Sequence, residues 1–461
     1  FILADDLGYG DLGAYGQERI RTPNLDRLAA EGLRFTRHYS GSAVCAPSRC
    51  VLLTGRHPGH AQIRDNTEVQ PEGQFPLEAD TPTLPRLMQR LGYRTGAFGK
   101  WGLGPPGSLG DPLQQGFDRF YGYNCQRAAH NHYPDGLWDD RRRVALRNPS
   151  FPAHQRLPAN ADPTNPDTYA GYRGSDYAPD LIAAEAEAFL RREAGRPFFL
   201  YYATTLPHLA LQVPGDSLAE YAGGFEDPPY DGSNAYLPHP SPRAAYAAMI
   251  TRLDASIGRL MQVLRELGVD RNTLVVFTSD NGPLFDRLGG TDSAFFNSAG
   301  GLRGRKGSLH EGGVRVPCIV RWPGLKWTGV SDRVTGFEDW LPTLLELAGG
   351  RDLVPPDVDG ISFVPTLLGR RQRERPFLYR EFPGYGGWQA VWRGDWKLVR
   401  HRPRPGGGMQ PPETVELFNL AEDPHEERNL APDHPRRVRS MLDLARVQHV
   451  RSARFPLPFE R

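Results

Sequence analysis

One stretch of the sequence, Pro197–Thr204, is almost continuously apolar and shows no alternation with polar residues. A strand of this kind has to be covered on both faces, which favours a mostly parallel sheet between helices. Two further apolar runs, Phe1–Ala4 and Thr273–Thr278, lead into Asp5-Asp6 and Asp280-Asn281. Ligands gather at the carboxyl ends of strands in open α/β sheets, so we expect these polar side chains at such an edge.

The chain is long enough for two units. It has 461 residues, more than one simple core accommodates, so we expect an α/β protein with a large domain and a smaller one. The predicted strands become shorter beyond about Gly349. We therefore place the large domain at residues 1–348 and the small α+β domain at residues 349–461. The small domain should hold an antiparallel sheet with a helix packed on it. The runs that predict these elements lie near Phe377–Phe382, Trp388–Trp392, Trp396–Arg400 and Pro435–Arg446.

The composition excludes several classes of protein. Formal net charge is +1, so nothing favours nucleic acid or an anionic membrane surface as the main partner. No apolar run is long enough to span a bilayer. The four cysteines, Cys45, Cys50, Cys125 and Cys318, are too few for a disulfide scaffold. No signal peptide is visible, but the chain opens inside an apolar strand, so this does not indicate the cytoplasm.

The segment Val44–Arg56 carries the most specific functional pattern. Pro47 suits the first position of a helix, because its missing N–H is not needed there. We then expect Cys45 just outside a helix N-terminus, where free N–H groups and the helix dipole favour an anion. Arg49 lies one helical turn after Cys45, on the same face, where its guanidinium can bind an oxyanion. The alternative is an ordinary buried thiol ahead of a helix.

This segment resembles the active-site signature of the sulfatases, Cys-x-Pro-Ser-Arg followed by Leu-Thr-Gly-Arg. The matching positions are Cys45, Pro47, Ser48, Arg49, Thr54, Gly55 and Arg56. The resemblance implies that a maturation enzyme oxidises Cys45 to formylglycine (3-oxoalanine), whose hydrate attacks sulfur. It also implies the alkaline phosphatase fold, an arylsulfatase-like sulfuric ester hydrolase and a periplasmic or secreted location.

A second interpretation uses the same segment. Cys50 and Arg56 have the Cys-x5-Arg spacing of cysteine-dependent phosphatases. Such a loop should be rich in glycine, so that its backbone N–H groups wrap a phosphate. The residues between them include Val51-Leu52-Leu53, which is typical of a packed helical turn. We therefore disfavour this alternative.

Lys100 stands at the end of a predicted strand, Tyr93–Phe98, and is flanked by glycines and Trp101. A lysine in this setting faces a ligand more often than one on an open surface. The segment resembles the sulfatase motif Gly-Lys-Trp-His-Leu-Gly, but Gly102 replaces the histidine that helps to expel sulfate. Three histidines are possible substitutes, and spacing favours none of them: His57, His130 and His310.

Two further motifs supply charged groups. His208 follows the apolar strand at Pro197–Thr204, and there we favour a general acid. The glycine-rich, basic stretch 300–317 resembles the second long sulfatase signature, which implies that Lys306 contacts sulfate. In the same stretch we take Arg303 as a substrate-binding residue. With Arg49 and Lys100, Lys306 is expected to neutralise charge on the sulfuryl oxygens while His208 protonates the departing alcohol.

The expected metal is one calcium ion. Asp5, Asp6, Asp280 and Asn281 all offer oxygen, which suits a hard cation. Sulfur is a poor calcium ligand, whereas an aldehyde hydrate at residue 45 offers an oxygen. The family resemblance assigns these residues, with Cys45, as the metal ligands.

The stretch 121–134 is dense in histidine and tyrosine. Aromatic rings beside polar tips suit a sugar, so we take His130 and His132 as substrate-binding residues for a sulfated carbohydrate or another small sulfate ester. A capped surface loop explains the pattern equally well. Two other functions stay open: a phosphonate or phosphate ester hydrolase of the same superfamily, and a catalytically silent sulfoglycan-binding relative.

Overall fold

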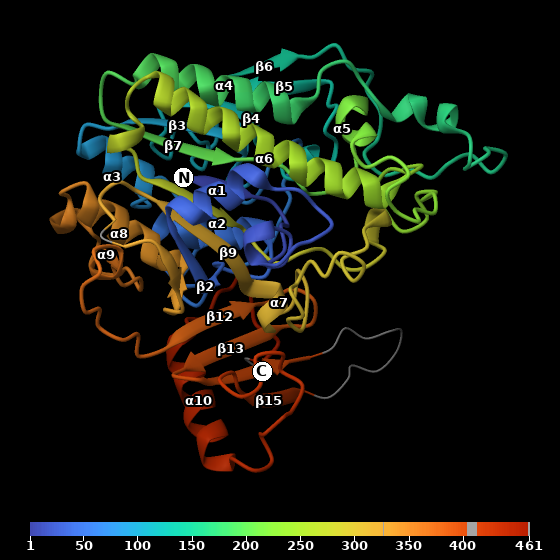
Figure 1. The fold of residues 1–461 in the computed structure, drawn as a ribbon. Helices are drawn as coiled ribbons and strands as arrows, with labels where there is room; N and C mark the ends of the chain where they lie inside the picture. Colours follow the sequence, from blue (N-terminus) through green and yellow to red (C-terminus); the bar gives the residue numbers. More distant parts are fainter. Residues whose placement is uncertain (326, 403–412, 460–461) are drawn as a thin grey trace.

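The computed structural model describes residues 1–325, 327–402 and 413–459. Within these ranges an eleven-stranded sheet forms the centre of the large unit (Figure 1), in the order β10-β2-β9-β8-β1-β7-β3-β4-β5-β6 with β11 beside β2. Its strands are β1 Ile2–Ala4, β2 Leu33–Tyr39, β3 Arg94–Lys100, β4 Arg119–Tyr123, β5 Gly136–Asp139, β6 Arg142–Ala145, β7 Phe198–Ala203, β8 Val275–Ser279, β9 Arg315–Arg321, β10 Gly329–Ser331 and β11 Thr335–Gly336. The central strands β8, β1, β7, β3 and β4 run parallel, so their carboxyl ends meet at one edge.

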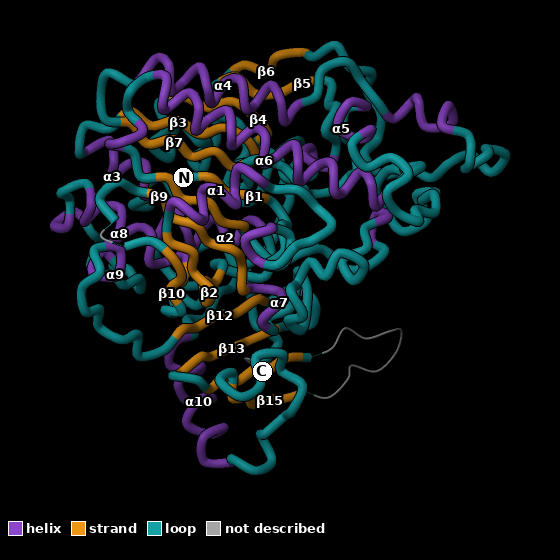
Figure 2. The backbone as a smooth tube through the Cα atoms, in the orientation of Figure 1, coloured by secondary structure: helices purple, strands orange, loops and turns teal. Residues whose placement is uncertain are grey.

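Helices cover both faces of this sheet (Figure 2). The α-helices are α1 Pro23–Glu31, α2 Cys45–Thr54, α3 Leu84–Arg90, α4 Ala178–Glu193, α5 Gly215–Ala219, α6 Pro242–Glu266, α7 Glu311–Val314, α8 Trp340–Leu347, α9 Val364–Leu367 and α10 Pro435–Gln448. The short 3-10 helices are η1 Gly13–Tyr15, η2 Ala128–His130, η3 Pro166–Tyr172, η4 Asp270–Asn272, η5 Leu288–Gly290, η6 Phe337–Asp339 and η7 Arg351–Leu353. Helices α1, α4 and α6 contribute to the hydrophobic core on one face, and α2, α3 and α8 to the core on the other.

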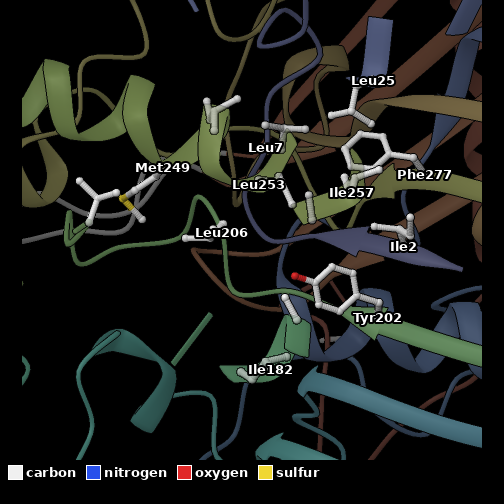
Figure 3. Packing of buried hydrophobic residues seen from close by; sticks show 14 of the residues in the cluster. Ile2, Leu7, Leu25, Ile182, Tyr202, Leu206, Met249, Leu253, Ile257 and Phe277 are labelled. Atoms are coloured by element: carbon white, nitrogen blue, oxygen red, sulfur yellow. The ribbon is translucent and has the colours of Figure 1, made fainter. Parts of the chain in front are cut away.

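The two cores explain why the central strands are apolar throughout. In β8, Phe277 packs into the core under α1, α4 and α6, while its neighbour Val276 packs into the core on the opposite face. Successive side chains of a strand point to opposite faces, so a strand buried on both sides needs apolar residues at every position. Figure 3 shows Phe277 and Ile2 of two adjacent strands meeting Leu25 and Ile257 of the helices.

A second, four-stranded antiparallel sheet is seen in the described part of the C-terminal region (Figure 1). Its strands are β12 Leu378–Phe382, β13 Trp388–Arg393, β14 Trp396–His401 and β15 Thr414–Asn419. One face packs on α10, for instance through Leu398 and Met441. The other face contacts Val44, next to Cys45, and Leu309, close to Lys306. The small sheet therefore supports two segments that we predicted to be functional.

The predicted fold class is confirmed: a mostly parallel sheet lies between helices, and a small antiparallel sheet carries one helix. The domain boundary after residue 348 stays a prediction. Phe363 and Leu367, which lie beyond it, pack in the same core as Trp340 of α8. Among the described residues, no helix combines the length and the apolar character needed to cross a membrane.

Candidate active site

The carboxyl ends of β1 and β8 bring four oxygen-bearing side chains together. Asp5 and Asp6 follow β1, Asp280 and Asn281 follow β8, and the two strands pair in parallel. The backbone N–H of Asp6 donates to Asp280 Oδ1 at 3.2 Å, and Asn281 Nδ2 donates to Asp6 Oδ1 at 2.7 Å. All four residues are fully buried.

Cys45 faces this group from the first turn of α2. Its Sγ lies 3.6 Å from Asp5 Oδ1, and the side chain is buried. The helix begins at Cys45, with Val44 as the extended N-cap, and not at Pro47 as we predicted. Pro47 is tolerated at the third helical position, because the N–H groups of a first turn need no intrahelical partner. Cys45 thus belongs to the helix N-terminus itself.

Three cations close the arrangement. Arg49 donates to Asp280 Oδ2 at 2.8 Å and to the carbonyl of Lys100. The Lys100 ammonium lies 2.7 Å from Asp5 Oδ2 and 3.3 Å from Cys45 Sγ. The Lys306 ammonium lies 2.8 Å from Asp6 Oδ2 and 3.5 Å from the same sulfur. Three buried carboxylates are therefore matched by three buried cations around one thiol.

Burial and charge shift the pKa values of these groups. Burial raises the pKa of Cys45 to about 12, despite the lowering effect of the Lys100 ammonium. Burial and the Asp5 charge raise the pKa of Asp280 to about 6. Burial would raise the pKa of Asp5 as well, but the ammonium of Lys100 holds it below its ordinary range. A free thiol at residue 45 is thus protonated and a weak nucleophile.

His208 completes the cluster. Its Nε2 lies 3.4 Å from Asp6 Oδ2, and its Nδ1 donates to the carbonyl of Leu209 at 2.6 Å. Because Nδ1 is committed to that carbonyl, Nε2 is the atom that can exchange a proton with a bound molecule.

The structure does not support His132 as a residue that touches substrate. Its ring is fully buried, with Nε2 2.9 Å from the carbonyl of His208 and Nδ1 3.2 Å from Thr205 Oγ1. Both ring nitrogens are occupied by the chain itself. His132 therefore holds the loop that carries His208.

Arg303 is also placed differently from our prediction. Its guanidinium donates to Glu416 Oε1 and to the carbonyl of Glu426, both at 3.0 Å, and lies over the ring of Phe418. These partners belong to the C-terminal region. Arg303 therefore ties the loop of Lys306 to the small sheet.

His130, in contrast, lies beside the cluster. Its ring stacks on that of His208, with centroids 5.0 Å apart. The other two histidines considered as substitutes at position 102 belong to separate clusters. His57 contacts Gln448 and stacks on His60, and His310 contacts Glu416.

The space beside Gly102 is filled by a glutamine. A Cβ built at position 102 would lie 2.5 Å from Gln126 Nε2, and Gly102 adopts a φ of +82°. Gln126 is buried, and its Nε2 has no hydrogen-bond partner within the described ranges. An amide can donate and accept hydrogen bonds, but it does not take up a proton as a histidine does.

Sequence reasoning missed two side chains. Tyr236 packs against His130 and His208, at centroid distances of 5.0 and 6.1 Å, and His154 packs against Tyr236 at 4.6 Å. Both residues come from long polar segments whose spacing carries no motif, so only tertiary structure reveals them. Lys306 and Tyr236 each retain 8% exposure, and His130 is half-buried, so solvent reaches the cluster at these residues.

The donor set fits a hard divalent cation. Asp5, Asp6, Asp280 and Asn281 present carboxylate and amide oxygens in one buried place. Asn281 Oδ1 is buried and has no hydrogen-bond partner among the described residues, as expected of an atom reserved for a metal.

Comparisons with known proteins identify the family of the chain. The sulfatase family model matches residues 1–350, and the C-terminal model of N-sulphoglucosamine sulphohydrolase matches residues 305–449. Arylsulfatase A of Bos taurus is 34% identical, over 93% of this chain and 82% of its own. N-acetylgalactosamine-6-sulfatase of Homo sapiens is 33% identical, over 82% and 67%.

One solved structure comes from work on the metabolism of multiple glycosaminoglycans by Bacteroides thetaiotaomicron. It has a TM-score of 0.77 and 27% identity, covering 97% of this chain and 98% of its own. The family model covers well over half of the sequence, and the relatives align along most of it. The chain therefore belongs to the sulfatase family of sulfuric ester hydrolases.

Proposed function

We propose that this protein removes sulfate from a sulfated carbohydrate, using formylglycine made from Cys45 and one calcium ion. The observation that carries the proposal is the meeting of Cys45 with three cations and three carboxylates in one buried place. We assign the metal to Asp5, Asp6, Asp280, Asn281 and the modified residue 45. When bound, calcium and formylglycine would supply the Lewis acid and the oxygen nucleophile that a protonated thiol cannot provide.

The chain's own residues then have distinct tasks. Arg49 and Lys100 neutralise charge that builds up on the sulfuryl oxygens, and both are fixed in place by carboxylates. Lys306 acts from the side that solvent reaches, because it retains 8% exposure whereas Arg49 and Lys100 are fully buried. Burial opposes a charge on Lys306, but the Asp6 carboxylate raises its pKa well above the ordinary value, so it stays cationic.

Proton transfer falls to His208. Its Nε2 faces the cluster while Nδ1 is held by Leu209. We propose that the doubly protonated ring delivers its Nε2 proton to the departing alcohol, and that the Asp6 carboxylate, 3.4 Å from Nε2, offsets the charge of this ring. Burial and the Lys100 charge lower the pKa of His208 well below its ordinary value, so the protonated ring gives up this proton readily. His132 contributes by holding the His208 loop through the carbonyl of His208.

A carbohydrate leaving group is supported by relatives and by the aromatic side chains beside the cluster. One relative is named for N-acetylgalactosamine 6-sulfate, and a structural neighbour comes from work on glycosaminoglycan metabolism. His130 and Tyr236 lie together beside His208, and their rings and polar atoms suit a sugar. A maturation enzyme is the partner that this proposal requires, and a periplasmic or secreted location goes with it.

The test measures sulfate release from N-acetylgalactosamine 6-sulfate and from 4-nitrophenyl sulfate, after co-production with a formylglycine-generating enzyme. We expect release by the wild type and none by Cys45→Ala. Cys50→Ala is the matched control, because Cys50 is a buried thiol of the same helix that lies in the hydrophobic core. It should keep most of the activity.

Parallel assays separate the remaining functions. Faster turnover of phosphate or phosphonate esters than of both sulfate esters would identify a phosphate or phosphonate ester hydrolase. Binding of the sulfated sugar without sulfate release would identify a silent relative. Full activity of Cys45→Ala would contradict the proposed centre.

A further inference from the structure

Three aromatic side chains line the approach to His208, and we call them the aromatic wall: His130, His154 and Tyr236. They come from η2, from the segment between β6 and η3, and from the loop that precedes α6. Their rings form one continuous group, with centroids 5.0 Å apart for His130 and Tyr236 and 4.6 Å for His154 and Tyr236. His130 in turn stacks on His208 with an interplanar angle of 20°.

Hydrogen bonds within the wall fix the position of each imidazole proton. The backbone N–H of Tyr236 donates to His154 Nδ1 at 3.1 Å. That nitrogen is therefore an acceptor, so His154 is neutral and carries its proton on Nε2. His154 Nε2 lies 3.0 Å from His130 Nδ1 and must be the donor of that pair. His130, as an acceptor at Nδ1, carries its own proton on Nε2.

His130 Nε2, the last donor in this chain of hydrogen bonds, is available to a ligand. Within the described residues, His130 Nε2 contacts no protein acceptor, and the residue is only half-buried. Burial and the neighbouring His208 keep the pKa of His130 well below its usual value, in agreement with a neutral ring. The wall thus presents a neutral N–H donor beside the reactive cluster.

The backbone holds Tyr236 in an unusual conformation. Ala235 and Tyr236 have φ values of +63° and +61°, a left-handed region that residues other than glycine rarely adopt. The hydroxyl of Tyr230 holds the turn by donating to the carbonyl of Ala235 at 2.5 Å. Such strained positions concentrate at functional sites. Here the strain aims one N–H at His154 and one ring at His208.

We propose that the aromatic wall binds the sugar ring that carries the sulfate ester, and that His154 is a positioning residue that sets the tautomer of His130. His130 Nε2–H donates to an oxygen of that ring, and the face of Tyr236 packs against it. The three side chains carry no charge, so they suit an uncharged hydroxylated ring better than a second anionic group. This inference rests on the proposed function and names the part of the site that selects the leaving group.

Kinetics and NMR together test whether the hydrogen bond from His154 sets the tautomer of His130. His154→Phe keeps a ring against Tyr236 but removes the donor to His130. One neutral hydrogen bond contributes about 0.5–1.5 kcal/mol, so the ratio of kcat/KM on N-acetylgalactosamine 6-sulfate to that on 4-nitrophenyl sulfate should fall about 2- to 12-fold, mainly through KM. His60→Phe is the control, because it replaces a histidine that contacts another histidine and Asp359 in a separate cluster, and it should leave the ratio unchanged.

The NMR measurement does not require the enzyme to turn over a substrate. With ¹⁵N-labelled histidine, the wild type should show His130 protonated at Nε2, and His154→Phe should show a mixture of tautomers. Wild-type His130 protonated at Nδ1, or an unchanged substrate ratio in His154→Phe, would overturn the proposal. If the wild type releases sulfate from neither ester, the proposed function fails. The tautomer of His130 still tests the hydrogen bond between His154 and His130 in that case.

Discussion

Two basic residues three positions apart on one loop differ completely in their surroundings. Lys306 points its ammonium at Asp6 and Cys45, whereas Arg303 is bonded to Glu416 and to the carbonyl of Glu426. Sequence alone treats both as anion-seeking residues of a glycine-rich stretch. The structure separates a residue that faces the reaction from one that holds the loop.

This contrast predicts different effects of removing each charge. Lys306→Met should lower kcat about 10²- to 10³-fold, because it removes a fixed cation from the developing charge. Arg303→Gln should change kcat/KM by less than about threefold and lower the unfolding temperature slightly, because a partly exposed ion pair contributes little. Steady-state kinetics and thermal unfolding of both variants check this. A larger kinetic loss in Arg303→Gln would indicate that Arg303 binds substrate, as we predicted from the sequence.

Buried charges join the small sheet to the loop of Lys306. Lys397 of β14 lies between Glu311 of α7 and Glu426, at 2.9 and 2.8 Å. Glu311 also accepts from Trp392 of β13 and Tyr39 of β2. Elements from both sheets therefore depend on one buried group of charges.

Glu426 makes stability depend on pH. Burial raises its pKa from 4.5 to about 7. Between these values the folded protein keeps a proton that the unfolded chain releases, so the contribution of Glu426 to stability falls as pH rises from about 4.5 to about 7. In urea unfolding, Glu426→Gln should therefore gain stability relative to the wild type between pH 5 and pH 8. Exposed Glu427→Gln is the control, and a wild-type-to-Glu426→Gln difference that does not vary with pH would contradict the assignment.

Local signals predicted the type of most elements but not all of their ends. The apolar run Pro197–Thr204 became β7, and the pattern from Pro435 became α10. The helix that we expected to begin at Pro47 begins two residues earlier, at Cys45. Proline fits any position of a first turn, because the N–H groups there need no intrahelical partner, so a proline alone does not fix the first residue of a helix.

At the scale of the whole molecule, the parallel sheet assembles the reactive cluster. Asp5 and Asp280 lie far apart in sequence, and the pairing of β1 with β8 brings them to one edge. Strand-end residues could be predicted from the sequence, because the edge rule needs only strand positions. The aromatic wall could not, since His154 and Tyr236 meet through two long connections without regular spacing.

Calcium should stabilise the whole fold. A ligand that binds only the folded state at 100 times its Kd contributes about 2.7 kcal/mol. We expect a higher unfolding temperature in calcium than in a chelator. Asn281→Leu, which removes an oxygen that no other described residue engages, should abolish this shift. Equal unfolding temperatures with calcium and with chelator for the wild type would contradict a calcium site.

The account as a whole depends on the chemical state of residue 45, because the buried thiol is protonated while the oxygen donors around it suit a metal. The most direct measurement is the mass spectrum of the tryptic peptide 38–49, from protein produced with a formylglycine-generating enzyme. We predict an aldehyde at residue 45 that reacts with a hydrazide probe. An unmodified cysteine in a preparation that fully hydrolyses sulfate esters would contradict the account.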